Sequence, residues 1–113
     1  MTAYLDDPRR IEADGLARAA EGADRLARYD DAMRLYAQAA TIEEAVAKSV
    51  PVAQPKLRSV LAVSAVALWA KAGRVDDVRR LAAVFMRTPE GLTFEAVRAM
   101  TNMLADASAR KRR

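Results

Sequence analysis

The sequence predicts a small all-α domain of about five helices, arranged as two antiparallel helical hairpins and a closing C-terminal helix. Three observations predict this class. Apolar residues recur at helical spacing, helix start and stop signals divide the chain into segments, and one central stretch is apolar on nearly every side. A chain of 113 residues fits one domain, which at this length buries about 65% of the surface of its unfolded chain. We expect one core within a single domain over residues 1–109.

The central stretch covers residues 59–72, SVLAVSAVALWAKA, and only Ser64 is polar between positions 60 and 70. A helix that is apolar all round belongs in an interior, so this segment is expected to be the central, buried helix. Arg58 and Lys71 end the apolar run well short of the roughly 20 residues that a membrane span needs. The sequence therefore predicts a buried helix and no contact with a membrane.

Start and stop signals place the other helices around this one. Asp7 before Pro8 predicts a helix start, because an acidic N-cap accepts a backbone N–H and proline at the first helical position loses no hydrogen bond. Paired acids suit the positive ends of a second and a fourth helix. Gly73 is expected to close the central helix in a left-handed conformation. We expect helices to begin near residues 8, 30, 55, 76 and 93, with breaks at the prolines of residues 50–55 and 88–91.

The composition argues against catalysis. The chain has no Cys and no His, which removes thiol and imidazole chemistry, disulfides and most zinc, copper or haem sites. It also lacks a glycine-rich phosphate loop and a nucleophile elbow. Adjacent acids occur at 6–7, 30–31, 43–44 and 76–77, but three of these pairs stand at expected helix starts, where capping accounts for them. We assign no catalytic, cofactor-binding or metal-binding residue.

The net charge of +4 equals the charge of the last four residues, RKRR, so the basic character belongs to a tail and not to a face. Such a tail favours nucleic acid only as an alternative, a nucleic-acid-associated regulator with salt-dependent, non-specific binding. The residues that would serve it are Arg98, Arg110, Lys111, Arg112 and Arg113. The first ten residues, MTAYLDDPRR, contain no apolar signal core, so a cytoplasmic protein is expected.

Two segments of the chain are alike: residues 27–35, ARYDDAMRL, and residues 73–81, GRVDDVRRL. Each is expected to form the turn into the second helix of a hairpin. Here the chain resembles the tetratricopeptide family and its helical-hairpin relatives, with Trp69 where an aromatic is usual in the first helix. The two turns are 46 residues apart, whereas the family repeats about every 34 residues, so the resemblance implies paired helices and not a regular superhelix.

The excess of apolar residues over positions 60–70 favours a non-enzymatic, helical-repeat-like adaptor or scaffold that binds another protein, or a second copy of itself as a homodimer, through this strip and the methionine-bearing last hairpin. A clamp for a terminal carboxylate is not expected, because only Arg25 and Lys71 suit the corresponding groove positions. The apolar strip of the central helix is either covered by the first or last helix of the same chain or receives a partner. Trp69, Met86 and Met100 are expected to fill the core, although the methionines of the last two helices could also form a pliable groove. The candidate partner contacts are Val60, Val63, Ala67, Lys71, Met100 and Met103.

Overall fold

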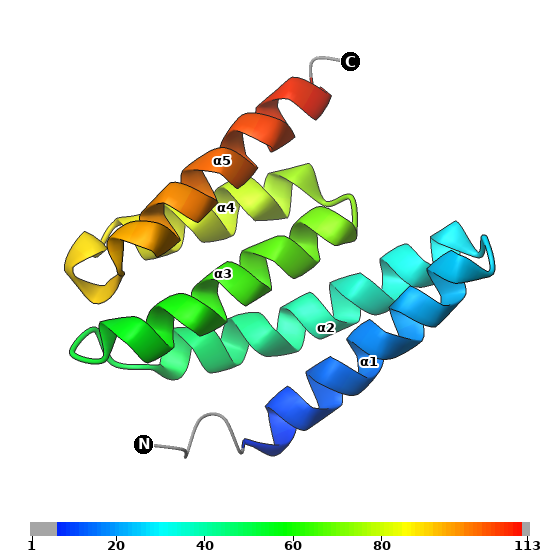
Figure 1. Cartoon of the computed structure of the whole chain (residues 1–113), viewed down its shortest axis with the longest axis horizontal. Coiled ribbons are helices and arrows are strands. Elements are labelled where there is room, and N and C mark those ends of the chain that lie inside the picture. The colour runs from blue at the N-terminus through cyan, green and yellow to red at the C-terminus, as the bar shows by residue number, and fades with distance from the viewer. Residues whose placement is uncertain (1–6, 112–113) are drawn as a thin grey trace.

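A computed structural model describes the backbone of residues 7–111 and the side chains of residues 7–109. Five α-helices and one short 3-10 helix follow one another in this part of the chain (Figure 1). They are α1 (Pro8–Arg25), α2 (Tyr29–Ser49), α3 (Pro55–Lys71), α4 (Val75–Met86), η1 (Pro89–Gly91) and α5 (Phe94–Lys111). The expected all-α class, with two antiparallel hairpins and a closing helix, is confirmed. Helix α5 continues to Lys111, so the expected boundary after residue 109 falls inside a helix.

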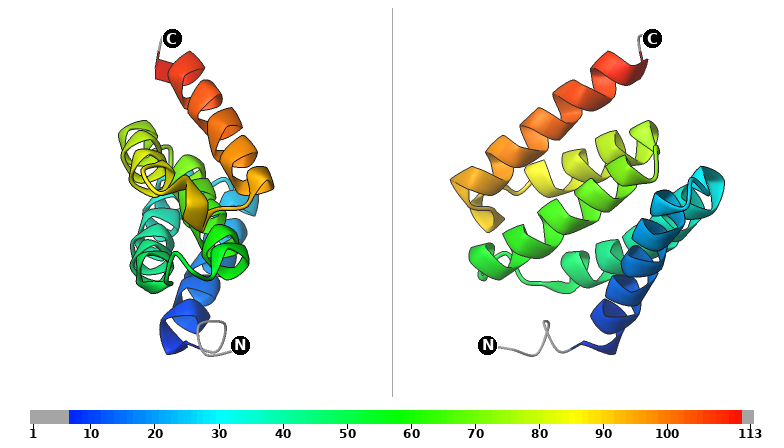
Figure 2. Two further views of the ribbon diagram at one scale, coloured as in Figure 1. Left: turned by 90° about the vertical axis from the view of Figure 1, so that its left-hand side faces the viewer. Right: turned by 45° about the vertical axis from the view of Figure 1, so that its right-hand side comes forward.

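The helices form a thin slab of 41 × 36 × 17 Å. Figure 1 shows them in sequence order, with α1 at one end of the row and α5 at the other, and each helix packs against the next. In the left view of Figure 2, α2 and α4 lie on one side of the slab and α3 and α5 on the other. Helix α3 also contacts α5 directly. A slab this thin holds only two layers of helices, because one helix with its side chains is about 10 Å wide.

The core runs along the row of helices and is centred on α3, which packs against α2, α4 and α5. Trp69 is 6% exposed and therefore belongs to this core, as expected. The first hairpin differs, because the residues that α1 buries against the rest of the chain are the small residues Ala13 and Ala20. The largest side chains that are fully buried are Phe85, Leu61, Leu81, Met100, Val46, Val66 and Val78.

The two hairpin turns have the same backbone conformation. Ala27 and Gly73 are the residues with positive φ in the described chain, at 59° and 72°. In both turns the N–H of the following arginine donates to a carbonyl five residues earlier: Arg28 to Ala23 at 2.8 Å and Arg74 to Trp69 at 3.0 Å. This is the Schellman pattern that closes a helix. The left-handed cap expected at Gly73 is confirmed, and the likeness between residues 27–35 and 73–81 corresponds to a real structural equivalence.

The acids at the helix starts act in two different ways. Asp7 caps α1 as expected, since its side chain accepts from the backbone N–H of Arg9 at 2.9 Å. Helices α2 and α4 have no side-chain cap hydrogen bond. Their acids lie in the first turn, where the helix dipole favours them, and Asp77 pairs with Arg74 at 2.9 Å.

The structure corrects the expectation that the central helix is buried on every side. Val60 of α3 is 59% exposed, and Lys56 and Lys71 at the two ends of the helix are exposed as well. Helices α2 and α4 back α3 and α5 lies beside it, but a slab of two layers leaves one side of α3 open. None of the described helices is long and apolar enough to cross a membrane.

Candidate protein-binding groove

A groove of about 400 Å³ opens on the slab between the N-terminal halves of α3 and α5. Val60 and Val63 supply its large apolar side chains, and alanines of α5 form the facing wall. One acidic side chain, Glu95, lies at its edge. The residues that line the groove are Ser59, Val60, Val63, Thr93, Glu95, Ala96 and Ala99.

One hydrogen bond between α3 and Thr93, and a second one at the start of α5, hold this end of the groove in shape. The buried hydroxyl of Ser59 accepts from the backbone N–H of Thr93 at 2.8 Å, and the Thr93 hydroxyl accepts from the N–H of Ala96 at 3.2 Å. Gly91 allows the chain to pass closely here, because a Cβ at this position would lie 3.1 Å from a side-chain atom of Val52 and 3.1 Å from one of Arg58. The groove is therefore preformed, which lowers the ordering cost of binding.

A buried guanidinium lies on the opposite side of α3 from the groove. Arg58 is 8% exposed, and its charged group lies 5.0 Å from the centre of the Phe85 ring. Its Nε and Nη1 atoms are buried without a hydrogen-bond partner in the described part of the chain. The contact with the aromatic ring offsets part of the cost of burying this charge. Nothing in the sequence pattern indicated that Arg58 would lie inside.

The candidate partner contacts fall into two groups. Val60 is exposed in the groove, Val63 is half-buried in it, and Ala67 and Lys71 continue the same face of α3. Met100 is fully buried, so it belongs to the core and offers no surface to a partner. It was expected both as core and as contact, and the core expectation is confirmed, because the α5 face that carries it packs against α3 and α4.

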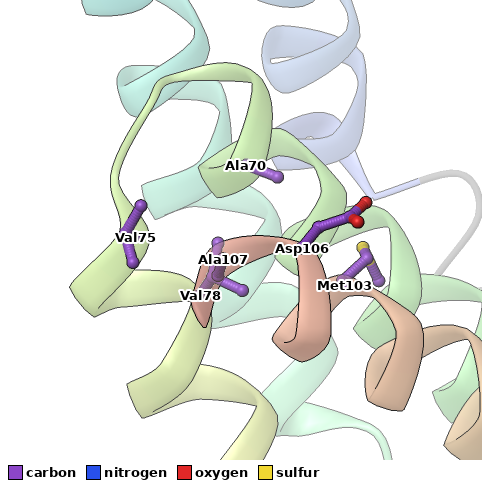
Figure 3. Close-up of a pocket in the computed structure, with 6 residues that line it drawn as sticks. All are labelled: Ala70, Val75, Val78, Met103, Asp106 and Ala107. Carbon is purple, nitrogen blue, oxygen red and sulfur yellow. The ribbon is translucent and has the colours of Figure 1, made fainter. Parts of the chain in front are cut away.

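Met103 lies apart from the groove, at a small hollow where the ends of α3, α4 and α5 meet (Figure 3). The volume of this hollow is about 40 Å³, which accommodates only a few water molecules. Figure 3 shows side chains from all three helices around it, with the Asp106 carboxylate next to Met103. We therefore assign the hollow no ligand.

An ion pair that the sequence did not predict joins α1 to the buried Glu43 of α2. Glu43 in the middle of α2 is 2% exposed, and its two carboxylate oxygens each accept from Arg10 of α1 at 3.1 Å. The hydroxyl of Ser64 on α3 donates to the same carboxylate at 2.8 Å. These groups line a polar hollow of about 90 Å³ between α1 and α3. Glu43 thus links three helices.

The neighbouring carboxylate links the second hairpin to α2. Glu44 accepts from the indole N–H of Trp69 at 2.9 Å, from both Nη atoms of Arg80 at 2.7 and 2.9 Å, and from Lys48 at 2.7 Å. Burial by itself raises the pKa of Glu44, but the hydrogen bonds from Arg80, Lys48 and Trp69 outweigh it and lower the pKa to about 2. Residues 43–44 were the one acid pair without a place at a helix start. The sequence pattern could have indicated that Glu43 is buried, because it shares a helical stripe with small apolar residues: Ala39, Ala40, Val46 and Ala47.

The structure places little of the alternative nucleic-acid set. Arg98 is exposed on α5, whereas the side chains of Arg110, Lys111, Arg112 and Arg113 lie outside the described part of the chain. Among the described residues no group of three acidic side chains converges on a point that could hold a metal ion.

No protein-family model, curated protein or solved structure matches the chain.

Proposed function

We propose that the protein is a non-enzymatic protein-interaction module, in which the groove between α3 and α5 receives an apolar segment of a partner protein. One observation carries this proposal: Val60, in the most apolar helix of the chain, is 59% exposed at a preformed groove. Val60 adjoins the half-buried Val63 in an apolar patch, and covering the exposed part of its side chain with a partner would contribute about 1 kcal/mol.

The charges along α3 suggest the chemistry of the partner. Lys56 and Lys71 are exposed at the two ends of the apolar strip and lie 15 residues apart, roughly 22 Å along the helix. Neither lysine forms an ion pair within the described residues, although Lys71 lies 5.8 Å from the centre of the Tyr36 ring. An amphipathic helix that has an apolar face and acidic residues near its ends would complement this strip.

The resemblance to tetratricopeptide proteins is part of the same proposal. The equivalent Schellman turns at Ala27 and Gly73 support it, as does the direct contact of α3 with α5, which are the first helices of successive pairs under this assignment. In helical-repeat proteins the stacked pairs form extended concave surfaces that bind partners. The groove between α3 and α5 corresponds to such a surface.

The test compares which proteins bind to the original chain, to a groove variant and to a control variant. The tagged chain, its Val60→Glu variant and an Ala45→Glu control on the exposed face of α2 are each incubated with lysate of the source organism, with and without nuclease. Bound proteins are quantified by mass spectrometry. We expect a partner that survives nuclease, binds the control as strongly as the original chain and is lost with Val60→Glu. Circular dichroism must show unchanged helicity in both variants. Position 60 is exposed, so the glutamate introduced there does not place a charge in the core.

Two outcomes would contradict the proposal. A partner that binds Val60→Glu undiminished does not use the groove. Binding that disappears with nuclease, and that is also lost when residues 110–113 are removed, would assign the function to the basic tail and nucleic acid.

A further inference from the structure

We propose that the outer face of α1 pairs antiparallel with α1 of a second copy of the chain. Helix α1 stands at the end of the row of helices and packs mainly against α2 (Figure 1). Its outer face carries Ile11 at 68% exposure, and Leu26, the C-cap residue that follows the helix, is 70% exposed. Neither residue contributes to the groove between α3 and α5, so this surface is distinct from the one proposed above.

Two glycines lie between these side chains on the same face. A Cβ at Gly15 or at Gly22 would meet nothing within 4 Å, so no contact inside the chain requires glycine at either position. Glycine within a helix costs about 1 kcal/mol relative to alanine. The exposed backbone instead allows a second helix to approach more closely than the usual 8–10 Å between helix axes.

The spacing of the four residues is symmetric. Ile11, Gly15, Gly22 and Leu26 follow one another at intervals of four, seven and four residues, so their pattern reads the same in both directions about a centre between positions 18 and 19. A two-fold axis through this centre places Ile11 of one copy opposite Leu26 of the other, and Gly15 opposite Gly22. A surface that complements itself in this way is what a two-fold dimer requires.

The charges on one flank of this face give the direction of pairing. Asp14, Arg18, Glu21 and Arg25 alternate in sign along the flank. In an antiparallel pair the same flanks of the two helices meet, so Asp14 lies beside Arg25 of the second copy and Arg18 beside Glu21. In a parallel pair the opposite flanks of the two helices would meet instead, so this flank would face Glu12, Ala19 and Ala23 of the second copy and these ion pairs would not form. Asp14 and Arg18 also form an ion pair within the chain at 2.6 Å, which neutralises the arginine nearest the axis.

A single pair of helices forms a small interface. Helix α1 is 18 residues long, roughly 27 Å, and one such contact falls below the standard size of a stable interface. We therefore expect a dimer that dissociates on dilution and that high salt weakens, because the flanking charges are exposed.

The test uses the absence of cysteine from the chain. An Ala19→Cys variant carries one thiol beside the proposed axis, and an Ala45→Cys variant carries one on α2 as a matched control. Under mild oxidation we expect Ala19→Cys to form a covalent dimer much faster than the control. Sedimentation velocity over a range of concentrations should show a monomer–dimer equilibrium for the original chain, and Ile11→Glu should raise the dimer dissociation constant at least about tenfold with helicity unchanged.

Replacing the two glycines distinguishes a role in dimerisation from a role in the stability of the monomer. We expect the variant with both Gly15→Ala and Gly22→Ala to unfold at a higher temperature, measured at a concentration where the original chain is monomeric, and yet to dimerise more weakly. The proposal is overturned if the original chain stays monomeric at all concentrations, or if the two cysteine variants cross-link at the same rate. It is also overturned if Val60→Glu dissociates the dimer while Ile11→Glu does not, because the groove would then be the contact between copies.

Discussion

The two hairpin turns have one backbone but different surroundings. Both end their first helix with a left-handed residue, Ala27 in the first turn and Gly73 in the second. Beside Ala27 the side chains of Leu26 and Tyr29 are 70% and 60% exposed. Beside Gly73, Ala72 is buried. The comparison shows that hydrogen bonds within a few residues set the path of such a turn, whereas tertiary contacts decide what packs around it.

The same contrast extends to the links between each hairpin and the rest of the molecule. The first hairpin is joined to α3 through the buried carboxylate of Glu43, which Arg10 neutralises. The second is joined to α2 through Glu44, whose partners Arg80 and Lys48 are both 42% exposed. The Glu43 link is thus the more buried of the two, since the side chain of Arg10 is 25% exposed and that of Glu43 only 3%, so the two links should respond differently to mutation and to pH.

The largest effect is expected from breaking the ion pair between Arg10 and Glu43. Arg10→Met leaves Glu43 buried with only the Ser64 hydroxyl as donor, and an uncompensated buried charge costs about 3 kcal/mol or more. Urea unfolding followed by circular dichroism should show this loss in the free energy of unfolding. Adding Glu43→Met to the same chain should restore most of it, because two apolar side chains then fill the space. A loss below about 1 kcal/mol in the single variant would show that Arg10 does not compensate the Glu43 charge.

The interactions of Glu44 should make the stability of the protein depend on pH. The pKa of Glu44 is lowered from 4.5 to about 2 in the folded chain, so the folded state binds fewer protons than the unfolded state between these values. Its contribution to the free energy of unfolding is fully present above pH 4.5 and is lost as pH falls toward 2. We expect a contribution on the order of 2 kcal/mol, less than the full shift implies, because solvent screens the partly exposed partners.

Glu44→Gln isolates this contribution from the other acids. The stability of the variant, measured by thermal unfolding from pH 2 to pH 7, should fall less steeply with acid than that of the original chain. Curves that run parallel across this range would show that Glu44 is not the group responsible.

Exchanging residues between the two turns should give smaller effects. Gly73→Ala places a Cβ at a φ of 72° and 3.3 Å from the sulfur of Met33. The left-handed conformation costs a residue with a Cβ about 1–2 kcal/mol, and the half-exposed Met33 side chain can move aside. Thermal unfolding should therefore show a fall in melting temperature of about 4–8 °C. An unchanged melting temperature would mean that the turn does not need glycine.

The reverse exchange should stabilise the protein. Ala27 already occupies a left-handed conformation at a φ of 59°, so Ala27→Gly relieves strain that the first turn contains. The greater freedom of glycine in the unfolded chain offsets part of this gain, which leaves about 0.5–1 kcal/mol. Thermal unfolding of the single variant and of the variant with both exchanges measures it. A destabilised Ala27→Gly variant would show that the alanine side chain contributes more by packing than it costs by strain.

The sequence predicted the helices and the breaks between them. Asp7, Gly73 and the prolines near residue 51 were sufficient, because capping, turn geometry and helix breaking depend on groups within about five residues of one another. The resemblance to tetratricopeptide repeats drew attention to Val60 and Val63 as groove positions, and both line the groove between α3 and α5.

The facing wall of the groove could not be predicted in the same way. Thr93, Glu95 and Ala96 line it only because α5 returns beside α3, and periodicity within one helix does not say which neighbour covers which face. For the same reason Met100 was a candidate contact until the packing of α5 placed it in the core.

The sequence by itself determined the local structure of this protein: five helices, two equivalent turns and a chain without Cys or His. Only the tertiary structure decided that one side of α3 stays open and that Glu43, 33 residues from Arg10, pairs with it inside the molecule. The reason is physical. Local hydrogen bonds and backbone preferences act between neighbours in the chain, whereas burial and ion pairing depend on how whole helices pack against one another.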